Sequence, residues 1–132
     1  LSDNTVEETL RWWTPVMSMA RQAAHDVEVR GKNVLEGQGL LMAYASANRD
    51  VDHWGPTAED FDITRSDAAG HVGFGVGEHF CMGAALARRE ARFVLAEVLR
   101  RAKGVHVTGQ RIKRESTLVN TFDRLDVTLD YR

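Results

Sequence analysis

The stretch GHVGFGVGEHFCMGAALARRE, from Gly70 to Glu90, contains the pattern on which the fold of this chain depends. Its first half is punctuated by glycines, which predicts a loop, whereas its second half is rich in alanine, leucine and arginine, which favour helices. The only cysteine of the chain, Cys81, lies at the junction, two residues after His79. The stretch therefore predicts a loop that presents one thiol at the start of a helix.

The helix after the cysteine is predicted to run from Met82 to Ala102. Apolar side chains recur there at spacings of three and four residues, which places them on one face of a helix, and Gly104 is a suitable residue to end it. The residues of this apolar face are Ala84, Ala87, Ala91, Val94, Leu95, Val98 and Leu99.

The segments before the cysteine loop predict a second helix and a long irregular segment. Val6 to Trp13 is expected to be helical, because polar residues at positions 2–4 can cap its first turn and Pro15 disfavours a longer helix. Residues 48–71 are rich in aspartate, glycine, proline and threonine and show little periodicity, so we expect an ordered meander there. Its anchors would be Trp54, Phe61 and Ile63.

Short strands separated by turns are predicted in the rest of the chain. A turn at Arg30–Lys32 separates Val27–Val29 from Val34–Leu35, and a turn at Gly37–Gly39 leads into a buried strand over Leu40–Tyr44. The predicted fold class is therefore α+β, with two main helices, small antiparallel sheets and an irregular meander. Further strand candidates follow the long helix, at Val105–Thr108, Ser116–Val119 and Leu125–Leu129.

Length and composition favour a soluble protein of the cytoplasm. A chain of 132 residues, 43% of them hydrophobic, suits one compact domain or a piece of a larger one, and a net charge of −2 gives no reason to expect nucleic-acid or membrane binding. Its apolar runs are too short to cross a bilayer, and no signal segment opens it. A single cysteine cannot form an internal disulfide, which fits a reducing compartment. Because the first residue is Leu1 rather than Met, we expect an incomplete translation product.

Several chemistries are open to the cysteine. A dinucleotide-binding loop is excluded, because the last glycine of its pattern is replaced by Glu78 or Phe80. A zinc site with His71 and His79 would lack a second cysteine pair at metal-ligand spacing. Activation of a nucleophilic Cys81 by His79 remains possible, although side chains two apart in an extended loop usually point apart. Taken alone, a single cysteine is more often a buried structural residue.

The surroundings of the sulfur favour a ligand for haem iron. Backbone N–H groups and the positive end of the helix dipole at a helix start stabilise thiolate over thiol. Small residues on both sides of the sulfur leave room for a broad, flat ligand, and a thiolate beneath a flat apolar surface is a known seat for haem iron. These small residues are Gly75, Gly77, Gly83, Ala84 and Ala87.

The sequence FGVGEHFCMGAALA, which begins at Phe74, resembles the haem-binding signature of cytochromes P450. Every fixed position of F-G-x-G-x-H/R-x-C-x-G-x-x-x-A is met. The resemblance implies haem b as cofactor and Cys81 as the proximal thiolate ligand of its iron. It also implies that His79 binds a haem propionate, that Phe74 packs beside the iron–sulfur bond, and that Gly75 and Gly83 belong to the same seat.

A second motif supports the resemblance. Glu8 and Arg11 form an E-x-x-R pattern, which on a helix is usually a solvated ion pair. By resemblance to the family it is the buried pair that pins the meander beneath the haem. The family completes the pair with a meander arginine, for which Arg65 is the candidate. Many relatives carry another arginine just before the Phe61 position, where this chain has Asp60.

Further segments match bacterial soluble members of the family. Ser46 to Asp50 reads S-A-N-R-D, and Arg21 lies in an R-x-A pattern whose arginine contacts a propionate in that group; the alternative is an exposed charge at a strand end. Val16 to Met19 and Leu118 to Phe122 would face an apolar substrate, although the methionines there could equally be core filler. Five arginines of the long helix form either a solvated face or a docking patch for an acidic electron donor. They are Arg88, Arg89, Arg92, Arg100 and Arg101.

The resemblance covers essentially the whole chain but only the C-terminal part of a P450. No A-G-x-D/E-T-like segment of the central helix is found. The implied function is that of a haem-thiolate monooxygenase, which inserts one oxygen atom of O2 into an apolar small molecule with electrons from NAD(P)H, delivered by a ferredoxin or similar donor and its reductase. The alternative is a non-catalytic truncated fragment without productive haem binding, which could self-associate.

Overall fold

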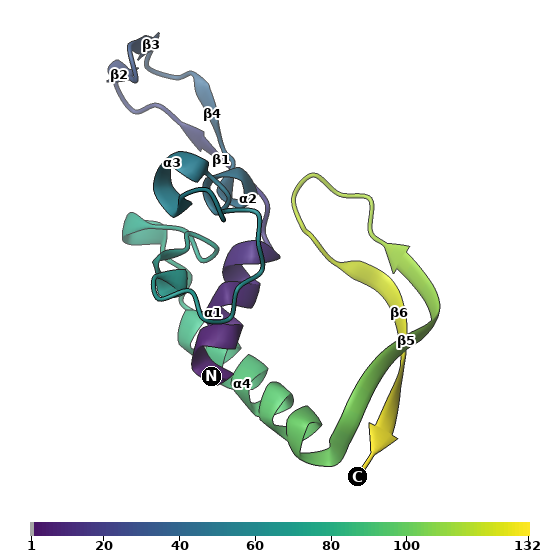
Figure 1. Ribbon diagram of the computed structural model, residues 1–132. Helices are drawn as coiled ribbons and strands as arrows, with labels where there is room; N and C mark the ends of the chain where they lie inside the picture. Colours follow the sequence, from purple (N-terminus) through teal and green to yellow (C-terminus); the bar gives the residue numbers. More distant parts are fainter. Residues whose placement is uncertain (1) are drawn as a thin grey trace.

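The computed structural model describes residues 2–132. Two helices lie against each other in the lower half of the molecule, and a long hairpin rises beside them (Figure 1). Helix α1 (Ser2–Trp12) and helix α4 (Ala84–Arg101) confirm the two predicted main helices, and α1 begins four residues earlier than expected. The C-terminal end of α1 is closed by Thr14, whose hydroxyl donates to the carbonyl of Arg11 at 2.6 Å.

Helix α4 differs from its prediction at both ends. It begins at Ala84, because Met82 lies in the turn after the cysteine, and it passes at Ala102 directly into strand β5 (Ala102–Lys113). Gly104 is therefore not a helix terminator. It lies inside β5 opposite Asp130, beside an irregularity of the strand register, where an added Cβ would come within 2.9 Å of the imidazole of His106.

Every sheet among the described residues is an antiparallel pair of strands. Strand β1 (Met19–Gln22) pairs with β4 (Gly39–Met42), β2 (Val27–Val29) with β3 (Lys32–Val34), and β5 with β6 (Phe122–Tyr131). The predicted turn between β2 and β3 is confirmed: Arg30 and Gly31 have φ angles of 47° and 75°, the left-handed geometry that a tight hairpin turn needs.

Two strand predictions were wrong, one in part and one entirely. The strand near Leu40 is not buried, since Leu41 is 72% exposed, and it ends at Met42, before Tyr44 begins a helix. Residues 116–119 form no strand; Val119 makes a single bridge to Val16. The strand expected at 105–108 is part of the longer β5. A period of two can identify a strand, but it does not show what covers each face.

The meander is irregular, as predicted, and contains only short helical turns. These are α3 (Val51–Trp54) and a 3₁₀ turn, η1 (Ala68–Gly70), and a further short helix, α2 (Tyr44–Ala47), lies just before the meander. Trp54 anchors the segment, because it is 6% exposed and its indole N–H donates to the carbonyl of Ala47 at 2.9 Å. Phe61 was a poor choice of anchor, since it is 47% exposed.

The most buried large side chains are polar. Glu8, Arg11 and Asn48 are all 0% exposed. Arg11 donates to both carboxylate oxygens of Glu8, at 2.7 and 2.8 Å, and to the meander carbonyls of Asn48, Ala58 and Asp60, at 2.7–2.8 Å. Because one guanidinium binds α1 and three points of the meander together, this cluster fixes the irregular segment without regular secondary structure.

The meander completes the cluster from its own side. The N–H of Asp62 donates to Glu8 Oε1 at 2.8 Å, and Arg65 Nε lies 3.5 Å from the same oxygen. Arg65 also donates to the carbonyl of Thr57 at 2.6 Å. Asp60 contributes its backbone carbonyl rather than a charged side chain. The Glu8 carboxylate therefore has several donors to balance its burial.

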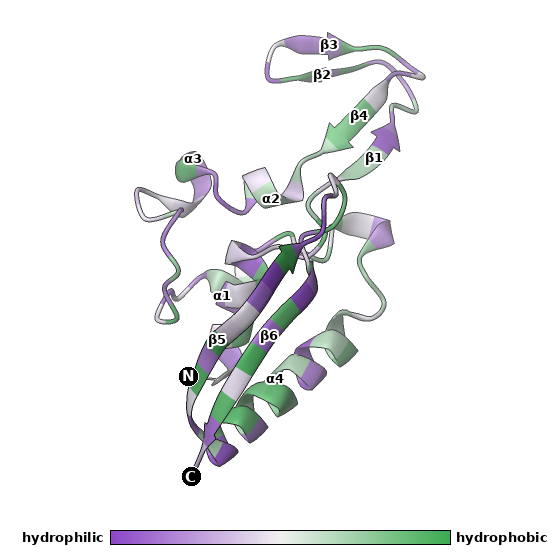
Figure 2. Cartoon of the chain, turned by 90° about the vertical axis from the view of Figure 1, so that its right-hand side faces the viewer, coloured by the Kyte–Doolittle hydropathy of each residue, from purple (hydrophilic) through white to green (hydrophobic). Residues whose placement is uncertain are grey.

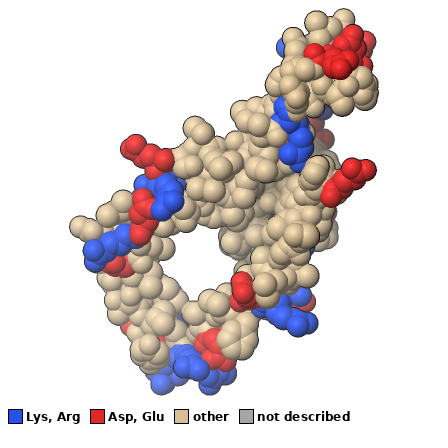
Figure 3. Space-filling model, turned by 180° about the vertical axis from the view of Figure 1, so that it is seen from behind, with Lys and Arg blue, Asp and Glu red and all other residues tan. Residues whose placement is uncertain are grey.

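The tip of the β5–β6 hairpin docks on the chain just after α1. Asn120 forms three bonds there: its N–H donates to Pro15 O at 2.8 Å, its side-chain amide donates to Trp13 O at 2.8 Å, and its carbonyl accepts from the Trp13 indole at 3.1 Å. The Trp13 and Phe122 rings stack with centroids 5.5 Å apart. This contact closes the chain into a ring, and the opening inside it is visible in Figure 3.

Apolar residues are frequent along α4 and the hairpin, where they are green in Figure 2, and many of them are exposed in the described part of the chain. Ala84 of the predicted apolar face is buried, but Val94 and Leu99 are each 59% exposed. Phe93 on the same helix is 68% exposed. No helix among residues 2–132 combines the length and apolar character needed to cross a bilayer.

The buried Glu8–Arg11 pair predicts a large stability effect. Glu8→Gln leaves the buried guanidinium without its counter-charge, so we expect the free energy of unfolding to fall by about 3–5 kcal/mol. Urea unfolding followed by circular dichroism measures this loss. Glu97→Gln removes a carboxylate that pairs with Arg100 on the exposed side of α4 and serves as the control, with little change expected. Equal losses in the two variants would contradict the assignment.

Candidate functional site

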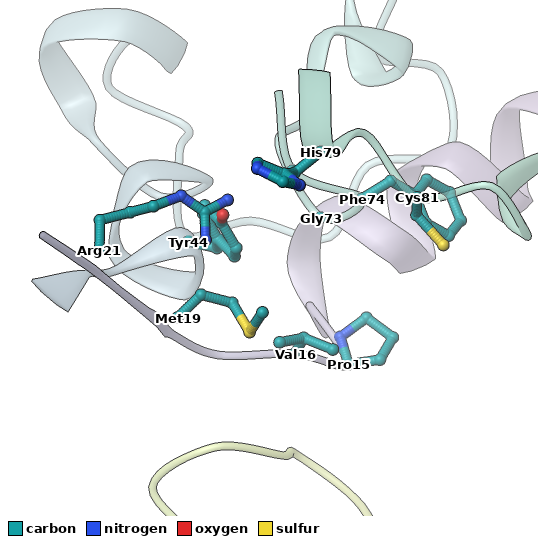
Figure 4. A pocket seen from close by; sticks show the side chains of 10 residues that line it. Pro15, Val16, Met19, Arg21, Tyr44, Gly73, Phe74, His79 and Cys81 are labelled. Atoms are coloured by element: carbon teal, nitrogen blue, oxygen red, sulfur yellow. The ribbon is translucent and has the colours of Figure 1, made fainter. Parts of the chain in front are cut away.

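A cavity of about 510 Å³ lies between the segment that follows α1 and the cysteine loop (Figure 4). Its walls are mostly apolar. Arg21 and His79 approach one end of it, and the sulfur of Cys81 lies toward the other. The residues that line it are Pro15, Val16, Met19, Arg21, Tyr44, Gly73, Phe74, Gly75, His79 and Cys81.

The cysteine loop is closed by one backbone hydrogen bond, from Cys81 N to Phe74 O at 3.0 Å. Gly75 and Gly77 have φ angles of 75° and 74°, which a residue with a side chain adopts only with strain. A 3₁₀ turn, η2 (Gly77–His79), completes the loop. The sequence therefore bends the backbone tightly enough to bring the cysteine back beside its own start.

Cys81 is exposed, so it is not the buried structural cysteine that a lone thiol usually is. An added Cβ on Gly83, the N-cap of α4, would lie 3.7 Å from the sulfur, so this glycine keeps the sulfur uncrowded. The side chains of His79 and Cys81 point in different directions, which disfavours a cysteine nucleophile activated by this histidine.

Arg21 and His79 supply the polar rim of the cavity. Arg21 extends from β1 and is half-buried, and its guanidinium donates a long hydrogen bond of 3.3 Å to the carbonyl of Ala20. His79 lies at the end of η2 and is exposed. A guanidinium and an imidazole at the same end of an apolar cavity suit a ligand with anionic groups at one edge.

The substrate-facing segments are placed differently from the prediction. Val16 and Met19 line the cavity, whereas Met17 and Leu118 do not. Met17 instead donates its N–H to the carbonyl of Leu118 at 2.8 Å, which fixes the hairpin tip behind the wall. Tyr44, which sequence reasoning missed, is buried and lines the cavity. No local pattern marks it, because its position depends on the turn from β4 into α2.

A second charged cluster, also missed, lies between α1, the loop and α4. Glu7 is 6% exposed, Arg88 donates to both of its oxygens at 2.8–3.0 Å, and His71 Nε2 lies 3.3 Å away. The His71 Nδ1 accepts from the N–H of Gly73 at 3.0 Å, so the ring is neutral with its proton on Nε2. The signal available in the sequence was two consecutive glutamates, Glu7 and Glu8, which point about 100° apart on a helix.

Burial and charge shift three pKa values in these clusters. For Glu7 and Glu8, burial raises the pKa, but hydrogen bonds and charges from Arg88 and Arg11 outweigh it, so both pKa values lie below 4.5. For His71, burial lowers the pKa below 6.5, against the opposing charge of Glu7. The glutamates are therefore charged and the histidine is neutral near neutral pH.

The arginines of α4 do not form a uniformly basic face. Arg88 and Arg92 pair with residues of α1, and Arg100 and Arg101 both pair with Glu97. These two bonds lower the pKa of Glu97 to about 2. On the face shown in Figure 3, charged side chains of both signs are interspersed.

The cysteine has no neighbouring set of further protein ligands. Among residues 2–132, no three His, Cys, Asp or Glu side chains come together as they would around a metal ion. A single protein ligand is what haem iron requires on one side, because the porphyrin supplies the four ligands in its plane. The exposed sulfur, the apolar walls, the uncrowded glycines and the cationic rim together fit a haem.

Comparison with known proteins agrees with this geometry. The family profile described as Cytochrome P450 matches residues 1–121, and this chain belongs to that family. CYP199A2 from Rhodopseudomonas palustris is 36% identical over 129 residues, which cover 98% of this chain and 31% of that protein. Cytochrome P450-terp from a Pseudomonas species is 41% identical over 104 residues, 79% of this chain and 24% of its own length.

Solved structures show the same fold. Cytochrome P450 CREJ superimposes with a TM-score of 0.91 at 33% identity over 98% of this chain. CYP109E1 from Bacillus megaterium, solved with testosterone, gives 0.89 at 34% identity over 95%. The chain spans 32% and 35% of these two structures, so it corresponds to about a third of a P450. Its α+β character is that of the C-terminal portion of the family fold.

The shifted pKa values predict how stability depends on pH. His71 and the two glutamates all have folded pKa values below their ordinary values of 6.5 and 4.5, so the unfolded chain binds protons first as the pH falls. The free energy of unfolding should therefore decrease below about pH 6.5 and more steeply below about pH 4.5. Urea unfolding at a series of pH values measures both steps. Glu7→Gln should weaken the second step, and a profile that is flat down to about pH 3 would contradict the prediction.

Proposed function

We propose that this chain forms the haem-thiolate seat of a P450 monooxygenase. The observation that carries the proposal is the exposed sulfur of Cys81 at the wall of an apolar cavity, three residues before α4 begins. This site would need only one protein ligand, because the porphyrin of haem b supplies four nitrogen ligands itself.

Each wall of the cavity has a separate task in this proposal. The loop closed by the Cys81 N to Phe74 O bond holds the sulfur in position, and Arg21 and His79 bind the propionates. Val16 and Met19 keep water away and contact an apolar substrate. Haem with a thiolate ligand supplies the cleavage of O2 and the insertion of one oxygen atom into a C–H bond.

The substrate class proposed is an apolar small molecule. The lining of the cavity supports this class, and so do two relatives: CYP109E1 was solved with testosterone and with corticosterone, and P450BioI was solved with hexadec-9-enoic acid ligated to acyl carrier protein. Electrons would come from NAD(P)H through a reductase and a ferredoxin or similar donor. An exposed cysteine suits a reducing compartment such as the cytoplasm.

The carbon monoxide spectrum tests the ligand. We expect the haem-saturated protein, reduced and exposed to carbon monoxide, to show the red-shifted Soret band of thiolate-ligated haem, because the anionic sulfur donates electron density to iron. Cys81→Ala should abolish this band. His25→Ala, a change of an exposed histidine outside the cavity, should keep it. A wild-type band typical of a nitrogen ligand would contradict the proposal.

A second candidate function is that of a non-catalytic fragment. It is favoured by the exposure of large apolar side chains, including Met82 at 102%, Phe93 at 68% and Val94 at 59%, in a chain that spans about a third of its relatives. Apolar surface of this extent favours self-association. In this second candidate, the segments of this chain would cover only one face of a bound haem.

Haem titration and turnover distinguish the two functions. We expect the isolated 132-residue chain to bind haem weakly and to show little hydroxylation, because large apolar side chains are exposed in a chain that spans about a third of its relatives. Size-exclusion chromatography should show self-association through the exposed apolar surface. Stoichiometric uptake of haem together with efficient hydroxylation by the purified chain would contradict the second candidate.

A further inference from the structure

Arg88 occupies an unusual position for a residue of a surface helix. Its guanidinium forms a forked contact with Glu7, with Nε donating to both carboxylate oxygens at 2.8 and 3.0 Å and Nη2 donating to one of them at 3.0 Å. The side chain of Glu7 is only 9% exposed and that of Arg88 is 24% exposed. A bidentate pair of this kind is rigid and is poorly screened by solvent.

The same guanidinium contacts the cysteine loop. Its central carbon lies 4.7 Å from the centroid of the Phe74 ring, within the range of a cation–π contact. Phe74 lines the haem cavity with its side chain, and its carbonyl accepts the hydrogen bond from Cys81 N at 3.0 Å. Arg88 is thus connected to the backbone of the cysteine through a single residue.

The other side of the loop is held by α1 through the same carboxylate. His71 Nε2 lies 3.3 Å from Glu7, and His71 Nδ1 accepts the N–H of Gly73, the residue before Phe74. An added Cβ on Gly73 would lie 3.2 Å from the carbonyl of Leu10, so the loop is pressed against α1. The carboxylate of Glu7 therefore lies beside His71 at the start of the loop and holds Arg88 against the ring of Phe74.

We propose that Arg88, oriented by Glu7, is a positioning residue for the thiolate ligand, which it holds in place by fixing the ring of Phe74. This inference rests on the proposed haem-thiolate function. The Glu8–Arg11 pair holds the meander, whereas Glu7–Arg88 holds the loop, so adjacent glutamates of α1 serve the two segments separately. Arg88 consequently belongs to the support of the haem seat and not to a partner-docking surface.

Haem titration of four variants tests the proposal. Arg88→Gln and Glu7→Gln should each weaken haem affinity about tenfold, the lower end of the effect of residues that orient metal ligands. Each should also convert part of the thiolate-type carbon monoxide band to the band of a neutral ligand at saturating haem. Arg88→Lys keeps the charge but loses the flat contact with Phe74, so an intermediate result is expected. Arg124→Gln removes an exposed arginine paired with Asp126 on β6 and is the control without effect.

A double-variant comparison separates positioning from folding. Because Arg88 acts through the ring, Arg88→Gln should change the band less in a Phe74→Leu background than in the wild type. Full additivity, or an Arg88→Gln variant that lowers the unfolding temperature but keeps the wild-type band and affinity, would overturn the inference. A wild-type protein without the thiolate band would overturn the proposed function itself, which the variants do not address.

Discussion

The packing of the meander against α1 depends on one buried ion pair. Glu8 and Arg11 are fully enclosed, and the guanidinium uses its donors to hold carbonyls that are 37 to 49 residues away in the sequence. The segment that it holds, residues 48–71, has only short helical turns, and Trp54 is its one large buried apolar side chain. A hydrogen-bonded charge therefore performs the task that a hydrophobic core performs in most domains of this size.

The helix that carries this pair also determines where the sulfur lies. Successive residues on a helix point about 100° apart, so Glu7 faces the cysteine loop and α4 while Glu8 faces the meander. One helix thus holds both segments with neighbouring carboxylates that point in different directions. The cysteine loop can be held in place although it is rich in glycines, because the restraint comes from side chains outside the loop.

Local patterns in the sequence predicted the parts of the site that are close together in the chain. The Phe74–Cys81 loop and the Glu8–Arg11 spacing could be identified because all their determining residues lie within a few positions of one another. The Glu7–Arg88 contact spans 81 residues, and no local pattern indicates it. Tyr44 was missed for the same reason. The strand near Leu40 exists, but its predicted end at Tyr44 and its predicted burial were wrong. Burial depends on what covers a strand or a helix, and for the same reason the sequence did not predict the exposed surface of α4.

The docking of the hairpin tip makes one wall of the cavity sensitive to a distant part of the chain. Pro15 accepts a hydrogen bond from Asn120, and Val16 forms a β-bridge with Val119. Because β5 begins where α4 ends, the cysteine loop is connected to this wall through α4 and the hairpin. A change in the length of the tip between β5 and β6 would move the apolar wall and leave the sulfur in place. Evolution could in this way alter the shape of the molecule that the cavity admits without disturbing the chemistry beneath it.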